Sequence, residues 1–103
     1  MAEIISLAYV RMDEGKDQET LQTLSELYTL MRRKGYSRDL LYRDLKQPHR
    51  YVNLRYWSSE DARDQAHEDP DVHRLWQRLA AISSVEAVSE RLELVPDTWS
   101  AGA

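Results

Sequence analysis

Apolar and polar residues recur along the chain with spacings that predict four strands and two helical segments. We expect the strands at 4–12, 36–45, 51–57 and 85–95. Between residues 17 and 34, leucines recur every three or four positions with charged residues between them, which predicts a helix with one buried face. The second helical segment follows Ser58, its expected N-cap. It is divided at Asp69-Pro70, because aspartate suits a cap and proline suits the first helical position.

The order of these elements predicts an α+β fold, the ferredoxin-like β-α-β-β-α-β arrangement. The connection at 46–50 has the length of a hairpin loop, so the second and third strands should pair antiparallel. We expect one antiparallel four-stranded sheet with the helices on one face. Residues 1–95 would form a single domain and 96–103 a C-terminal tail, in which Trp99 would anchor on the body or on a partner subunit.

The predicted sheet has a second apolar face, which two helical segments cannot cover. The first strand is apolar on both sides, and the third strand carries apolar residues on the side away from its polar ones: Val52, Leu54 and Tyr56. The simplest cover for this second face is the same face of another copy of the chain. The pattern therefore predicts a homodimer that associates through the sheet.

Composition excludes several classes of function. The formal net charge of -4 over 103 residues argues against a general nucleic-acid-binding protein, which needs a basic surface. No apolar run approaches the ~20 residues of a membrane helix, and the N-terminal segment lacks the features of a signal peptide. Cysteine is absent, which excludes thiolate chemistry and fits a cytoplasmic location. The three glycines cannot form a phosphate-binding loop.

The third strand carries polar side chains on the face that the helices should cover. Asn53, Arg55 and Trp57 share this face, because successive strand side chains alternate between two faces. His67 lies in the helix that follows, and histidine titrates nearest to neutral pH. Asn53 and Trp57 offer N–H donors, which could stabilise a substrate oxygen that gains negative charge during a reaction, and His67 offers a proton acceptor. We therefore expect these three residues to be catalytic.

Each candidate has a structural alternative. Trp57 and Trp76 are also placed to fill the core, Trp76 because it lies on the apolar stripe of the second helical segment. His67 is also placed to cap its short helix by bonding to backbone. Arg55 would bind an anionic substrate or form an ion pair with an acid on a neighbouring strand. No third ligand with suitable spacing accompanies His67 and His73, so we expect no metal site.

The stretch from Tyr51 to Leu79 resembles the antibiotic biosynthesis monooxygenase family of dimeric α+β barrels. The matching features are a third strand that ends in Trp57, the helix start Ser-Ser-Glu-Asp-Ala, His67, Asp69-Pro70-Asp71 and the segment LWQRL. The resemblance extends loosely over residues 4–95. It implies the dimeric α+β barrel fold and, for many members, oxygenation of phenols and quinols without any cofactor.

The resemblance transfers to individual residues only in part. The polyketide oxygenases of the family use an asparagine and a tryptophan four residues apart in the third strand, which Asn53 and Trp57 match. They use a tyrosine where this chain has Arg63, and an arginine near Gln77 or Arg78. We expect a cofactor-independent monooxygenase acting on a hydroxylated aromatic, quinol or polyketide-type substrate, with Arg55, Trp76 and Arg78 in contact with that substrate.

Haem degradation, another activity of the family, is disfavoured. Its members need an asparagine in the first strand, where this chain has Ala8, and a tryptophan where His67 stands. They also need a histidine iron ligand, where this chain has Gln77. Two other functions stay open: a homodimer that binds a small ligand without catalysis, and a structural homodimer with a filled core. A cavity lined by Asn53, Trp57 and His67 would separate these possibilities.

Overall fold

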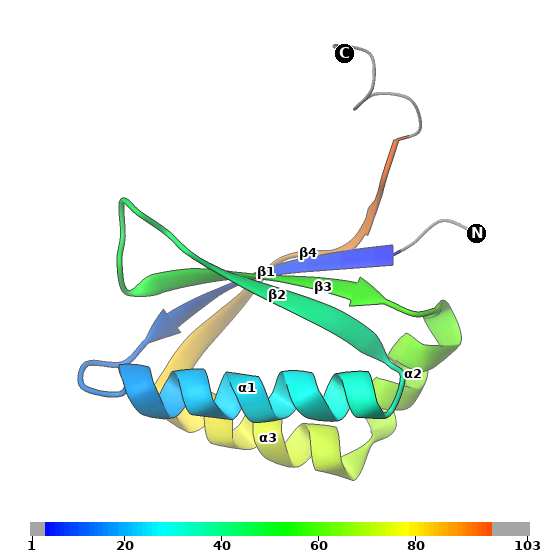
Figure 1. The fold of residues 1–103 in the computed structure, drawn as a ribbon, viewed down its shortest axis with the longest axis horizontal. Coiled ribbons are helices and arrows are strands. Elements are labelled where there is room, and N and C mark those ends of the chain that lie inside the picture. The colour runs from blue at the N-terminus through cyan, green and yellow to red at the C-terminus, as the bar shows by residue number, and fades with distance from the viewer. Residues whose placement is uncertain (1–3, 96–103) are drawn as a thin grey trace.

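The computed structural model describes residues 4–95, and within them the chain forms one sheet and three helices (Figure 1). The elements are β1 (Ile4–Met12), α1 (Asp17–Arg33), β2 (Ser37–Arg43), β3 (Arg50–Trp57), α2 (Glu60–Glu68), α3 (Pro70–Ile82) and β4 (Ser83–Glu93). The predicted order is confirmed, with the second helical segment present as α2 and α3. The expectation for Trp99 lies outside the described residues.

The sheet is antiparallel throughout, and its strand order is β2-β3-β1-β4. Figure 1 shows α1 and α3 running side by side along one face of the sheet, with α2 beside the end of β3. The ferredoxin-like α+β fold is therefore confirmed. We call the side that packs on the helices the covered face of the sheet, and the other side the open face.

Local signals explain where the helices begin and end. Gly35 follows α1 with a φ of 74°, a left-handed conformation that glycine adopts without steric cost. Asp69 caps α3, since its side chain accepts a hydrogen bond from the Asp71 N–H at 2.9 Å. The prediction of Ser58 as the cap of α2 was wrong by one residue. The side chain of Ser59 accepts the Ala62 N–H at 3.0 Å.

The hydrophobic core lies between the covered face and the helices. One cluster joins Val10 and Tyr51 of the sheet to Leu24 and Leu79 of α1 and α3. A second cluster, nearer to α2, surrounds Trp57. β3 alternates strictly between buried and half-buried residues along its length, as a strand does when only one face is covered. This alternation determines which β3 side chains reach the interior.

The open face keeps apolar side chains in contact with solvent in the single chain. Leu40 is 40% exposed and Tyr42 is 53% exposed on β2, and Leu92 of β4 is 39% exposed. Leu40 pairs with Leu54 across the strands, which continues the apolar surface onto β3. The predicted second apolar face is therefore present. No helix within residues 4–95 is long and apolar enough to span a membrane.

Candidate functional site

The covered face of β3 supplies the polar residues of the candidate site. Asn53, Arg55 and Trp57 are all buried there, at 5%, 6% and 4% exposure, as the alternation of the strand predicted. Polar groups at such depth require partners, because an unpaired buried donor or acceptor is costly. The partners of these three side chains therefore determine what the site can do.

A cavity of about 200 Å³ opens beside these residues, between the sheet and the helices. Its lining includes, in chain order, Asn53, Arg55 and Trp57 of β3, Arg63 and His67 of α2, and Trp76 of α3. β1 and β4 complete the wall on the other side. The fold thus gathers five of the six side chains that the sequence singled out: Asn53, Arg55, Trp57, His67 and Trp76.

Arg55 is held by an ion pair inside the protein. Its Nε donates to Oδ1 of Asp39 at 2.5 Å, and the Asp39 side chain has no exposed surface. The two residues face each other across β2 and β3, so the predicted pairing with a cross-strand acid is confirmed. The guanidinium carbon lies 5.4 Å from the ring centre of Trp57 and 5.7 Å from that of Trp76, within the range of cation–π attraction.

The indole N–H of Trp57 already has a partner. It donates to the Ser6 hydroxyl at 2.8 Å, and that hydroxyl donates in turn to the Glu90 carbonyl at 2.7 Å. Trp57 therefore presents its ring to the cavity, with its N–H committed to the protein. The His67 ring meets the Trp57 ring edge-on, with ring centres 6.0 Å apart and an interplanar angle of 78°.

His67 is exposed, so it stands where the cavity meets solvent. The structural alternative predicted that the His67 ring caps its own helix by a hydrogen bond to the backbone. A hydrogen bond to the backbone here is made by a different histidine, since Nε2 of His73 bonds to the carbonyl of His67. The imidazole of His67 thus faces the cavity and solvent together.

Asn53 is loosely held. Its amide Nδ2 donates to the Leu40 carbonyl at 3.4 Å, a long hydrogen bond that contributes little. The side chain is nevertheless buried and lines the cavity. The amide is therefore positioned to exchange this weak contact for a stronger one to a bound oxygen atom.

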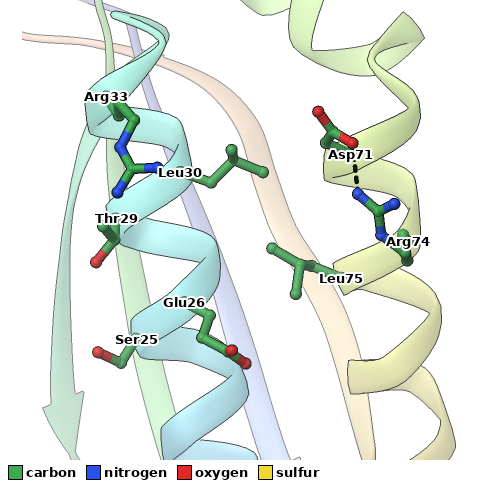
Figure 2. A pocket seen from close by; sticks show the side chains of 8 residues that line it. All are labelled: Ser25, Glu26, Thr29, Leu30, Arg33, Asp71, Arg74 and Leu75. Atoms are coloured by element: carbon green, nitrogen blue, oxygen red, sulfur yellow. Dashed lines mark hydrogen bonds and ion pairs between the residues drawn. The ribbon is translucent and has the colours of Figure 1, made fainter.

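Arg78 does not join the others. It pairs with Glu26 of α1 at 2.8 Å on the exposed outer side of the helices. A wider hollow of about 510 Å³ lies there between α1 and α3, and Figure 2 shows Leu30 and Leu75 pointing toward each other across it. Arg74 at its edge pairs with Asp71 of the same helix. None of the catalytic candidates lines this hollow, so the smaller cavity is the candidate site.

Three polar residues at or beside the site were not singled out from the sequence as functional. Asp39 holds Arg55. Arg63 lines the cavity with a buried Nε that has no hydrogen-bond partner in the described part of the chain. Tyr28 of α1 has a buried hydroxyl without a hydrogen-bond partner among the described residues, and burial, with the nearby charge of Asp39, raises the pKa of that hydroxyl. The family resemblance pointed to position 63, where other members use a tyrosine, but gave its arginine no role.

Several solved structures share the fold. The structure of SnoaB, a cofactor-independent oxygenase from Streptomyces nogalater, has a TM-score of 0.78 at 20% identity and covers 94% of this chain and 99% of its own. A possible oxidoreductase from Bacteroides thetaiotaomicron has a TM-score of 0.78 at 10% identity, covering 90% and 98%. A putative antibiotic biosynthesis monooxygenase from Nitrosomonas europaea has a TM-score of 0.77 at 11% identity, covering 93% of both chains. At such identities the likeness shows the fold alone.

The amino-acid sequence carries the family relationship more directly. No functionally curated protein matches the chain significantly. The profile of the family named antibiotic biosynthesis monooxygenase, however, matches residues 3–79, which is well over half of the chain and includes β3, α2 and most of α3. The chain belongs to the antibiotic biosynthesis monooxygenase family.

Proposed function

We propose that the protein is a cofactor-independent monooxygenase that acts on a hydroxylated aromatic, a quinol or a polyketide-type phenol. The observation that carries the proposal is the cavity in which Asn53, Trp57 and His67 meet. Membership of the family and the fold shared with SnoaB, a cofactor-independent oxygenase, support it. A structural protein with a filled core would have no such cavity.

The reaction balances without an added reductant. A phenol with a free para C–H and one O₂ give a quinone and one water, so the substrate supplies both hydrogens of that water. The protein has to remove the phenolic proton and to stabilise the resulting anion, which then reduces oxygen. Donors directed at a developing oxyanion are the strongest means of such stabilisation, each typically changing the rate by a hundredfold or more.

The side chains around the cavity suit these tasks. His67 at the solvent edge accepts the phenolic proton and passes it to water. The Asn53 amide donates to the oxyanion from the buried end, in exchange for its weak contact with Leu40. Arg55, whose charge is balanced by Asp39, adds its unpaired Nη2 donor, and the rings of Trp57 and Trp76 hold the flat substrate.

The size of the cavity limits the substrate. An apolar cavity of roughly 150 Å³ holds one benzene molecule. A cavity of about 200 Å³ therefore suits one ring or two fused rings, and a larger polycycle would need it to widen. We expect naphthol-sized compounds to be accepted better than compounds with three or four rings.

Oxygen uptake tests the proposal. With 1-naphthol and a metal chelator present, the protein should consume oxygen and form 1,4-naphthoquinone and water. A blank without protein measures the uncatalysed oxidation. Tight binding of naphthols without oxygen uptake would contradict an oxygenase and support the alternative, a non-catalytic ligand-binding protein. The engagement of the Trp57 N–H by Ser6 favours that alternative, because it removes one of the expected donors.

We further propose that the functional unit is a homodimer formed through the open face. The exposed Leu40, Tyr42 and Leu92 lie on that face, and no helix of the described chain covers it. Apolar side chains gathered in this way favour association with a matching surface. A second copy of the chain supplies such a surface by two-fold symmetry.

A further inference from the structure

Two arginines of the cavity have buried N–H groups without partners. Nη2 of Arg55 and Nε of Arg63 are both buried and make no hydrogen bond with any residue between 4 and 95. Both residues line the cavity, Arg55 from β3 and Arg63 from α2. Buried polar groups without partners are rare in folded proteins, and each one requires a reason.

The ion pair with Asp39 does not satisfy Arg55. Asp39 accepts from Nε, which leaves Nη2 unpaired although the residue is only 6% exposed. A guanidinium group cannot lose its proton, and it has only donors. The missing partner must therefore be an acceptor, and an acceptor with two oxygens in one plane fits a guanidinium best.

The charges around the cavity also favour an anion. Asp39 balances the charge of Arg55, so Arg63 is the arginine of the lining that decides the balance, and Glu90 is the one acidic residue among the described residues that line the cavity. The Glu90 side chain is 71% exposed, and its Oε2 stays 3.8 Å from Nη2 of Arg63. This distance and exposure leave most of the Arg63 charge uncompensated inside the cavity.

We propose that the ligand of this cavity is an aromatic carboxylate, bound with its carboxylate toward Arg55 and Arg63 and its ring against Trp57 and Trp76. The proposal rests on the proposed function in taking the cavity as the substrate site, and it adds the class of substrate, a hydroxylated aromatic acid. The hydroxyl-bearing carbon of such a ligand remains free to lie near Asn53 and His67.

Paired ligands that differ only in the carboxylate test this proposal. Binding of 1-hydroxy-2-naphthoate and of 1-naphthol is measured without oxygen by quenching of tryptophan fluorescence, since Trp57 and Trp76 line the cavity. The wild-type protein should bind the naphthoate at least tenfold more tightly. Arg63→Gln and Arg55→Lys should each reduce this preference severalfold. Arg74→Gln, a matched change on the outer side of α3, should preserve it.

The outcomes separate this proposal from the oxygenase proposal. Equal affinity for the two ligands, no saturable binding of the naphthoate, or a preference that persists in either folded variant would overturn the carboxylate site. If Arg55→Lys does not fold, Arg63→Gln decides, because Arg63 lies only partly inside the protein. A strong naphthoate preference without any oxygen uptake would support the carboxylate site and overturn the oxygenase.

Discussion

At the scale of single residues, β3 places an arginine where a core residue would ordinarily pack. Arg55 is buried beside two tryptophans, and its charge is balanced by the fully buried Asp39. Removing charge from water is costly, and such a pair is rarely retained for stability alone. A role in ligand binding gives a reason for the arginine, because Nη2 remains unpaired.

Loss of Asp39 should therefore be severe. Asp39→Ala leaves the Arg55 charge buried without its partner, and we expect a loss of about 3 kcal/mol in the free energy of unfolding, measured with urea. Glu26→Ala, which breaks the exposed pair with Arg78, should cost less than about 1 kcal/mol. In the double variant Asp39→Ala/Arg55→Met the loss should be smaller than the sum of the single losses. Additive losses would show that the two residues do not interact.

Single residues also show how far the sequence predicted the site. The two-residue period of β3 was enough to place Asn53, Arg55 and Trp57 on the covered face. The engagement of the Trp57 N–H could not be foreseen, because it depends on the register that brings Ser6 of β1 beside β3. The unpaired Nε of Arg63 likewise depends on how α2 packs on the sheet.

At the scale of elements, one carboxylate connects the end of α1 to the start of α3. Asp69 caps α3 and accepts from Lys34 Nζ at 2.6 Å and from the Tyr36 hydroxyl at 2.7 Å. These hydrogen bonds, that of Lys34 first, hold the pKa of Asp69 well below its usual range. The ionised carboxylate is therefore bound more strongly in the folded protein than in the unfolded chain.

The sign of the pH dependence follows from the lowered pKa of Asp69. Its stabilisation is complete above the unfolded-state pKa of about 3.9, and it is lost as the pH falls from there toward the lower folded-state pKa. Wild-type stability should therefore fall more steeply below about pH 4 than that of Asp69→Asn. Chemical unfolding at several pH values measures this, with the exposed Asp64→Asn as control. Parallel curves for wild type and Asp69→Asn would contradict it.

The elements themselves were largely predictable. Asp69-Pro70 marked the break between α2 and α3, and Gly35 marked the end of α1, because both signals act within a few residues. Choices between neighbouring candidates were not predictable in this way. Ser59 rather than Ser58 caps α2, and Arg78 extends to the outer side of α3, although the family resemblance had indicated a substrate contact near this position.

At the scale of the whole molecule, the open face predicts the state of assembly. Sedimentation at micromolar concentration should give about twice the chain mass of 12.1 kDa. Leu40→Lys puts a charge on the apolar open face and should shift the protein toward monomer, because a charge is costly to bury in an interface. Thr29→Lys, on the exposed side of α1, should leave the mass unchanged. A monomeric wild type would contradict the dimer.

Turnover of Asn53→Ala tests the central claim most directly, namely that this cavity is where oxygen chemistry occurs. We expect the kcat for oxygen uptake with a naphthol to fall by roughly a hundredfold or more, the size of a lost oxyanion donor. Folding should change little, since the amide makes a single long hydrogen bond within residues 4–95. Arg74→Ala, outside the cavity, should keep wild-type activity. A folded Asn53→Ala variant with wild-type kcat would contradict the account.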